Sequence, residues 1–225
     1  MEKLEMIQTF DTVVLADGTF PTSEIPLEEL RRAKRVICCD GAANSLVKFG
    51  REPDFIAGDL DSIPENLKTR YSSILYHFAE QETNDLTKSV NFCFSRGWKE
   101  ITILGATGKR EDHTLGNLSL ITNYAENGKI QLLTDYGVFT PQLSSATYES
   151  VAGQQVSIFS LLPETRFTTR GLVYPICNRG LTSWWQGTLN EATGNEFTIE
   201  INSGKVLVFR LFTQPPTLPP TSKTR

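Results

Sequence analysis

Short apolar runs alternate with helical patterns over the first 140 residues. Runs of strand length occupy 13–16, 36–39, 55–57, 101–104 and 130–133. Between them, apolar residues recur at helical spacing over 27–33, 42–49, 85–96 and 115–121. Strands that alternate with helices are typical of a mostly parallel sheet with crossover helices. The pattern therefore predicts an α/β, Rossmann-like domain over residues 1–140.

Polar residues and glycines mark the ends of two predicted helices. Gly50 follows the 42–49 helix at the position where helices turn left-handed. Asn84 is placed to cap a helix that begins at Asp85, and Gly97 follows that helix. These signals set the expected boundaries of both helices.

The helical period disappears after residue 140. Strand-like runs occupy 156–162, 168–176, 197–201 and 206–212. Asn202-Ser203-Gly204 separates the last two and indicates a hairpin. We therefore predict an all-β sandwich domain over residues 141–212. Residues 213–225 contain four prolines and no apolar period, which predicts a disordered tail.

Composition and charge narrow the possible partners. The 22 basic and 26 acidic residues give a net charge of −4, and no basic run could follow a nucleic acid, so none is expected as a partner. No apolar stretch approaches the length of a membrane span, and acidic residues stand where a signal peptide has basic ones. We expect a cytoplasmic protein that does not enter a membrane. Its four cysteines lack metal-site spacing and are expected to be buried free thiols.

Acidic residues follow several of the predicted strands. Asp40, Asp59, Asp61 and Asp112 all come after apolar runs. Ligands of open α/β sheets bind outside the carboxyl ends of the strands, where these side chains converge. In an extended segment Asp59 and Asp61 point the same way, and Gly58 leaves room beside them. Taken alone, Asp59-Leu60-Asp61 favours an ordinary polar turn. Together with the other acids at strand ends, it indicates a magnesium site.

Cationic and helix-start residues offer further candidates. Asp85 begins a helix, with Lys88 one turn on, although dipole stabilisation or a surface contact explains this pair as well. The loop from Gly105 to Arg110 contains two glycines and Lys109, which suits phosphate, but it lacks the P-loop pattern. His113 near the next helix start is compatible with a structural role.

Two adjacent tryptophans stand out in the β-rich part. Neighbouring residues of a strand point to opposite faces, so only one of Trp184 and Trp185 could stack on an aromatic ligand. The other is expected to pack in the protein.

These motifs become specific when they are taken in order along the chain. They are Asp40-Gly41-Ala42-Ala43-Asn44, Gly58-Asp59-Leu60-Asp61-Ser62, Gln81 through Lys88, Gly105 through His113, Gly171 through Pro175, and Gly187-Thr188-Leu189-Asn190-Glu191. This succession resembles the thiamine pyrophosphokinase family over nearly the whole chain, the tail excepted.

The resemblance implies an activity and a set of residues. It implies transfer of the pyrophosphoryl group of ATP to the hydroxyl of thiamine, with Mg²⁺, in a homodimer whose thiamine sites lie between subunits. By this resemblance the magnesium residues are Asp59, Asp61 and Asp85, and Arg110 and Asp112 face the reacting phosphates, with Asp112 a candidate proton acceptor. The nucleotide-binding residues implied are Asp40, Gly41, Asn44, Lys88, Lys109 and His113. Those implied for thiamine are Gln81, Thr188 and Asn190.

Two positions depart from the family pattern. Leu189 stands where the family usually has a serine, so Thr188 is the candidate replacement for its hydrogen bond to thiamine. Glu82-Thr83-Asn84-Asp85 retains only the last acid of the third motif. Two other functions remain open on the residues alone: a magnesium-dependent nucleotide pyrophosphohydrolase, or a non-catalytic nucleotide sensor.

Overall fold

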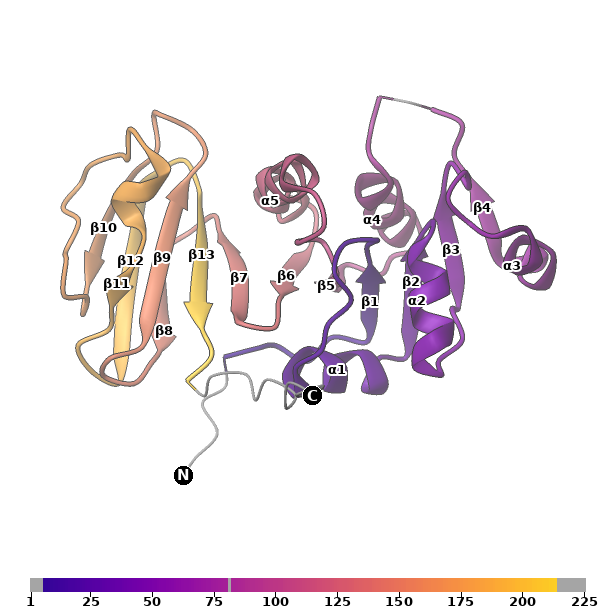
Figure 1. Cartoon of the computed structure of the whole chain (residues 1–225). Coiled ribbons are helices and arrows are strands. Elements are labelled where there is room, and N and C mark those ends of the chain that lie inside the picture. The colour runs from indigo at the N-terminus through magenta and orange to yellow at the C-terminus, as the bar shows by residue number, and fades with distance from the viewer. Residues whose placement is uncertain (1–5, 81, 214–225) are drawn as a thin grey trace, which may run out of the picture.

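The protein has an α/β half and a β-rich half, seen at the right and left of Figure 1. The structure, a computed structural model, describes residues 6–80 and 82–213. Gln81 and the predicted tail from residue 214 onward lie outside the described residues. Within those ranges, no helix combines the length and the apolar character needed to cross a membrane.

The α/β half follows the predicted alternation closely. Its elements are β1 (Thr12–Leu15), α1 (Glu24–Arg32), β2 (Arg35–Cys39), α2 (Ala42–Phe49), β3 (Phe55–Gly58), α3 (Glu65–Arg70), η1 (Ser72–Ile74), β4 (Leu75–His77), α4 (Asp85–Ser95), β5 (Glu100–Leu104), α5 (Glu111–Tyr124) and β6 (Lys129–Leu133). The strands pair in the order β6-β5-β1-β2-β3-β4, and every pair is parallel.

Both faces of this parallel sheet are buried. Val13 and Leu15 pack on one face with residues of α1 and α2, including Leu30 and Leu46. Val14 faces the opposite way and belongs to the cluster that α4 and α5 cover. Burial on both faces explains why the strands are continuous apolar runs rather than alternating ones.

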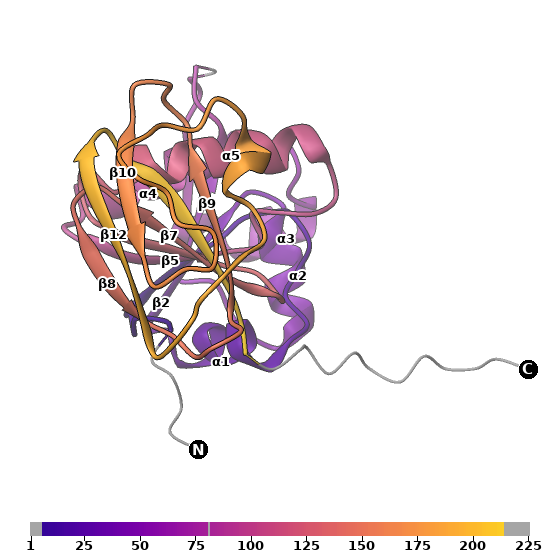
Figure 2. The ribbon, with the colours of Figure 1, turned by 90° about the vertical axis from the view of Figure 1, so that its left-hand side faces the viewer.

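The β-rich half is a sandwich, which confirms the predicted fold class. Its elements are β7 (Gly137–Gln142), β8 (Ala146–Glu149), β9 (Gln155–Ser160), β10 (Arg166–Arg170), η2 (Trp184–Gly187), β11 (Asn190–Glu191), β12 (Glu196–Ser203) and β13 (Val206–Leu211). Antiparallel pairing of β6 with β7 continues the large sheet into β13, β9 and β11. The sheet β10-β12-β8, which Figure 2 faces, packs on that extension around Phe167 and Phe197.

The predicted helix boundaries are confirmed in their details. Gly50 adopts a φ of 93° after α2, and its N–H bonds to carbonyls of the last turn. Asn84 caps α4, and its side-chain oxygen accepts a hydrogen bond from the Thr87 N–H. Gly97, with a φ of 78°, follows that helix.

The predicted hairpin at residues 202–204 is wrong. β12 pairs only with β10 and β8 in the described chain, whereas β13 pairs with β7 and β9. β12 belongs to the three-stranded sheet and β13 to the large sheet, so Ile199 and Val206 enter the sandwich core from opposite sheets. The chain therefore crosses between the sheets here instead of folding back within one.

Two smaller expectations in the β-rich half also differ. The strand predicted over 168–176 ends at Arg170 in the structure. Trp184 and Trp185 lie in the short helix η2 rather than in a strand, and both are exposed. The alternation argument that assigned them to opposite faces therefore does not apply.

A matched pair of glycine substitutions tests the conformation of the turn between β12 and β13. Gly204 has a φ of 76°, and an added Cβ would lie 2.4 Å from the Thr165 hydroxyl oxygen. Gly204→Ala should lower the free energy of unfolding by at least about 1 kcal/mol, because left-handed backbone is unfavourable for alanine. Gly116→Ala, in α5 with open space around it, should raise it by roughly 0.5–1 kcal/mol. Urea unfolding measures both changes in the free energy of unfolding. Equal effects of the two substitutions would contradict the left-handed conformation of Gly204.

Candidate active site

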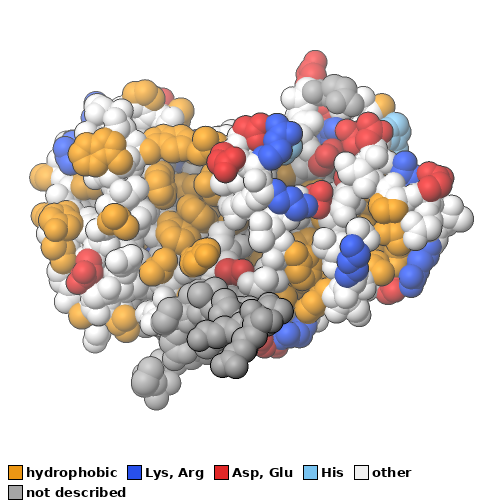
Figure 3. All heavy atoms as spheres, in the orientation of Figure 1, with side chains coloured by type: hydrophobic (Ala, Val, Ile, Leu, Met, Phe, Trp, Pro, Cys, Tyr) orange, Lys and Arg blue, Asp and Glu red, His pale blue; other side chains and the backbone are white. Residues whose placement is uncertain are grey.

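A cavity of about 400 Å³ opens beyond the carboxyl ends of the parallel strands. Asp17 follows β1, Asp40 follows β2 and Asp59 follows β3, so parallel strands bring all three to one edge. Charged side chains gather over the α/β half, whereas the β-rich half shows mainly hydrophobic ones (Figure 3). Of the residues expected from the sequence, the cavity is lined by Asp40, Gly41, Asp59, Asp85, Lys88, Lys109, Arg110 and His113.

Three carboxylates crowd together in this cavity. Asp40, Asp59 and Asp85 each place an oxygen within 4.8 Å of the other two. Asp40 is buried, its Oδ2 accepts a hydrogen bond from the Ser62 N–H at 2.8 Å, and its Oδ1 has no partner in the described chain. Burial, with repulsion from Asp85 and Asp59, raises the pKa of the Asp40 carboxyl. Buried, under-bonded carboxylate oxygens fit a divalent cation.

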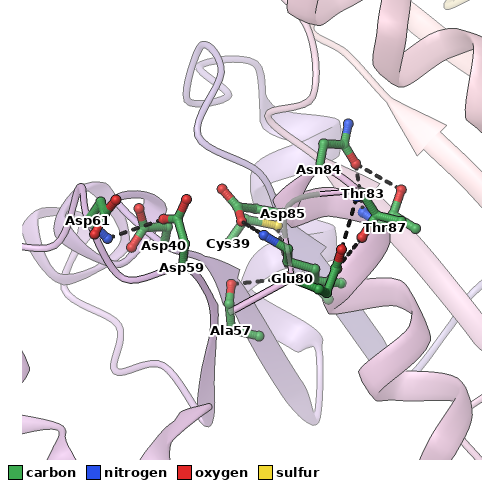
Figure 4. A network of polar contacts seen from close by, with 12 residues as sticks. Cys39, Asp40, Ala57, Asp59, Asp61, Glu80, Thr83, Asn84, Asp85 and Thr87 are labelled. Carbon is green, nitrogen blue, oxygen red and sulfur yellow. Dashed lines mark hydrogen bonds and ion pairs between the residues drawn. The ribbon is translucent and has the colours of Figure 1, made fainter. Parts of the chain in front are cut away.

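Asp61 lies apart from this cluster. The expectation that Asp59 and Asp61 point the same way is wrong, because Leu60 between them has a φ of 66° and the segment is not extended. The Asp61 N–H donates to Asp59 Oδ1 at 3.2 Å, while the exposed Asp61 side chain lies on the outer side of the turn (Figure 4).

Backbone strain concentrates at the site. Asp40, Leu60 and Lys109 are three of the five described non-glycine residues with positive φ. Such conformations cost of order 1 kcal/mol each and often mark functional sites. A Cβ on Gly58 would lie 3.1 Å from the Asp40 Cβ and 3.2 Å from Asp85 Oδ1, so glycine there allows the acids to approach.

The start of α4 supplies Asp85 and a buried cation. Lys88 Nζ lies 3.3 Å from Asp85 Oδ1, and the lysine side chain is only 3% exposed. The alternative of a surface contact between these two is therefore excluded. Before the helix, Glu80 accepts hydrogen bonds from the Glu82 and Thr83 N–H groups and thereby shapes the approach to Asn84.

The loop between β5 and α5 presents unbonded N–H groups. Carbonyls of Gly105, Ala106 and Thr107 accept hydrogen bonds from the Gly18 N–H, Asn117 Nδ2 and Thr19 N–H at 2.6, 2.9 and 2.8 Å. In contrast, the backbone N–H groups of residues 106–110 have no acceptor in the described chain. Gly105, Gly108 and Lys109 have positive φ, and such turns form concave anion sites. This arrangement supports the predicted phosphate-binding role of the loop.

Arg110 and Asp112 form a two-point ion pair. Arg110 Nε and Nη2 contact the two Asp112 oxygens at 3.1 and 2.5 Å. The hydrogen bond from Arg110 makes the largest contribution, and that from the His113 N–H the next largest, to lowering the pKa of Asp112 to about 2. Both side chains are exposed, and only Arg110 lines the cavity. So paired, Asp112 is a weak base that orients Arg110.

The remaining predicted residues that the structure describes lie outside the cavity lining. Asn44 is in the first turn of α2. Asn190 is buried, and its amide exchanges two hydrogen bonds with the Tyr174 backbone, at 3.0 and 2.7 Å. Thr188 donates its hydroxyl to the Trp185 carbonyl. Gln81 is outside the described residues.

The cavity also contains residues that the sequence reasoning missed. Asp17 follows β1 as Asp40 follows β2, and its Oδ1 lies 2.9 Å from Lys109 Nζ. The strand-end rule applied to the first strand would have found it. Asn84 was predicted only to cap a helix, yet it also lines the cavity. Asn117 lies inside a predicted helix, and no sequence signal indicated that its side chain would reach the cavity.

Comparison with known proteins shows the same family over both halves. Residues 27–132 match the model for the catalytic domain of thiamin pyrophosphokinase, and 137–209 match the model for its substrate-binding domain. Thiamine pyrophosphokinase 1 of Oryza sativa subsp. japonica is 29% identical over 212 residues, covering 80% of this chain and 79% of the relative. Thiamine pyrophosphokinase of Bacillus subtilis is 27% identical over 152 residues, covering 64% and 71%.

Solved structures share the fold. The crystal structure of the Bacillus subtilis thiamine pyrophosphokinase has a TM-score of 0.75 at 22% identity, covering 90% of this chain and all of that one. The yeast thiamin pyrophosphokinase has a TM-score of 0.72 at 17% identity, covering 93% and 89%. Neither the hydrolase nor the sensor alternative finds support in these comparisons. Both domain models, the curated relatives and the shared fold establish that this chain belongs to the thiamin pyrophosphokinase family and is an enzyme of that kind.

Proposed function

We propose that the cavity binds the magnesium complex of ATP and that its pyrophosphoryl group is transferred there to the hydroxyl of thiamine, giving thiamine diphosphate and AMP. The observation that carries this proposal is the juxtaposition of the Asp40, Asp59 and Asp85 carboxylates with the N–H-rich loop after β5. A metal–phosphate complex needs carboxylates on one side and N–H groups or cations on the other.

Asp59 and Asp85 are the proposed direct magnesium ligands, with Asp40 beside them. Asp61, exposed on the outer side of the turn, contributes charge through water. When bound, Mg²⁺ supplies neutralisation of the phosphate charge. Carboxylate oxygens are its preferred protein ligands, and the buried Asp40 Oδ1 has no hydrogen-bond donor in the described chain.

Cationic and backbone groups hold the nucleotide in this proposal. Lys109, Arg110 and the N–H groups of 106–110 bind phosphate oxygens, and Asp112 keeps Arg110 in place. Lys88 is buried beside Asp85 and balances its charge, while Gly41, Asn44 and His113 border the nucleotide. Such positioned charges favour in-line attack by the thiamine oxygen without a covalent protein intermediate.

Thiamine is proposed to bind near Thr188, Asn190 and Gln81, at a homodimer interface. In the described chain every residue lining the acidic cavity precedes residue 118, so the β-rich half adds none to its own subunit's cavity. That half exposes several large apolar residues: Val173, Tyr174, Trp184, Trp185 and Leu189. An apolar surface of this kind favours contact with a second copy. There Asn190 would act by holding Tyr174 in position.

We infer a cytoplasmic location from the thiols. Cys38, Cys39, Cys93 and Cys177 are all free, as expected in a reducing compartment. The first three are buried as expected, whereas Cys177 is exposed.

Thermal and chemical unfolding with Mg²⁺ test the metal site. At a concentration one hundredfold above its Kd, Mg²⁺ should add about 2.7 kcal/mol to the free energy of unfolding. Asp59→Asn should remove this gain, and Asp61→Asn should reduce it less. Asp40→Asn should raise the free energy of unfolding without Mg²⁺, because one repelling charge is removed.

Asp11→Asn is the control, because Asp11 is an exposed acid paired with Lys34 away from the cavity. This variant should retain the full response to Mg²⁺. A normal response in Asp59→Asn would exclude it as a ligand.

Mixing two inactive variants tests the intersubunit site. Asp59→Asn and Asn190→Ala chains should each synthesise little thiamine diphosphate, because the first lacks a proposed metal ligand and the second no longer holds Tyr174. When they are refolded together in equal amounts, half of the chains enter heterodimers with one intact composite site. Activity should recover to about a quarter of wild type by statistical pairing in a two-fold dimer. Heterodimers confirmed by native mass spectrometry but lacking activity would show that one chain supplies the whole site.

A further inference from the structure

Asn117 in α5 bonds to both oppositely charged sides of the cavity. Its Nδ2 donates to the Ala106 carbonyl at 2.9 Å, in the loop that presents N–H groups. Its Oδ1 accepts from Asn84 Nδ2, also at 2.9 Å. Asn84 caps α4, where Asp85 is the first residue. One amide thus joins the phosphate loop to the helix that carries a proposed metal ligand.

The bond to Ala106 has a directional consequence. A peptide unit is planar and trans, so its C=O and N–H point in opposite directions. By holding the Ala106 carbonyl, Asn117 sets the direction of the Thr107 N–H, which has no acceptor in the described chain. Gly18 and Thr19 hold the two adjacent carbonyls through their backbones. Asn117 therefore supplies a side-chain hydrogen bond to this loop at Ala106, and the Thr114 hydroxyl supplies a longer one, of 3.5 Å, to the Gly108 carbonyl.

The bond to Asn84 acts on the acidic side. Asn84 Oδ1 accepts hydrogen bonds from the Thr87 N–H and hydroxyl at 2.9 and 2.8 Å, so its amide nitrogen is free to donate to Asn117. Because both the oxygen and the nitrogen of the Asn84 amide are hydrogen-bonded, the spacing between the first turn of α4 and the β5–α5 loop is fixed.

Asparagine is an unfavourable choice for this position on helical grounds. Its helix propensity is below that of alanine or leucine, and a residue in α5 needs no polar amide for the helix itself. Its amide oxygen and nitrogen instead form hydrogen bonds with Asn84 and with the Ala106 carbonyl. A local preference overridden in this way often marks a functional position.

We propose that Asn117 is a positioning residue for pyrophosphoryl transfer, which fixes the N–H groups of the β5–α5 loop relative to Asp85. This inference rests on the proposed function of the cavity. Misplacement of reacting groups by about 1 Å can lower rates on the order of a hundredfold. Loss of Asn117 should therefore affect turnover and phosphate binding more than stability.

Kinetics of five variants test the inference: Asn117→Ala, Asn117→Asp, Asn84→Ala, the Asn84→Ala/Asn117→Ala double variant and Asn123→Ala. Asn117→Ala should lower kcat roughly ten- to a hundredfold with little change in KM for thiamine, whose proposed residues lie elsewhere. Asn117→Asp keeps the acceptor for Asn84 but loses the donor to Ala106, so it should be equally impaired. Asn84→Ala combined with Asn117→Ala should be less than additive, because the two share one bond. Asn123→Ala, on the same helix but bonded to Lys205, is the matched control and should keep wild-type kcat.

A second measurement separates this inference from the proposed function. Calorimetry with magnesium and inorganic pyrophosphate reports on the loop without thiamine, and Asn117→Ala should weaken binding about tenfold while Asn123→Ala does not. If wild type makes no thiamine diphosphate but the pyrophosphate difference persists, the proposed function fails and the positioning role stands. If Asn117→Ala lowers only the melting temperature, with kcat and pyrophosphate affinity unchanged per folded molecule, the inference is overturned.

Discussion

Electrostatic repulsion among Asp40, Asp59 and Asp85 is the constraint on which the α/β half of this structure depends. Two ionised carboxylates within 4.8 Å repel by roughly 3 kcal/mol at an effective dielectric constant of about 20. The parallel sheet forces this proximity, because Asp40 and Asp59 follow neighbouring strands and Asp85 starts the helix packed over them. The fold must therefore hold together side chains that would otherwise separate.

Several features accommodate this crowding. Gly58 leaves space between Asp40 and Asp85, and Ser62 donates its N–H to one oxygen of Asp40. Lys88 is buried against Asp85 and offsets its charge. Positive φ at Asp40 and Leu60, which follow the buried strands β2 and β3, adds strain of order 1 kcal/mol at each residue. This crowding of carboxylates is the basis of the proposed magnesium site.

The opposite side of the cavity is organised by the backbone. The loop after β5 has its carbonyls bonded to Gly18, Thr19 and Asn117, and its N–H groups are left unbonded. Acidic side chains and a loop with unbonded N–H groups thus line one cavity, an arrangement suited to the proposed metal–phosphate complex. Continuation of the sheet from β6 into β7 anchors the β-rich half and its exposed Trp185 and Leu189 to this same framework.

Hydrophobic period and helix-end signals were sufficient to predict most of the α/β half, because buried parallel strands and capped helices are dictated by neighbouring residues. The same patterns placed Asp40, Asp59 and the loop containing Lys109 at strand ends, and the ordered motifs indicated the family. The sequence by itself therefore determined the fold class, the edge of the sheet that carries the site, and the chemistry of its residues.

Tertiary structure alone decided which of these side chains meet. Asp61 was expected beside Asp59, but a left-handed residue at Leu60 separates them, and such a φ is not encoded by a leucine. Strands flanking residues 202–204 looked like a hairpin, because local turn signals do not reveal that both strands face one core from opposite sheets. Asn117 reaches Ala106 and Asn84 only because α5 packs beside α4. Contacts between residues distant in sequence depend on packing, which no local pattern contains.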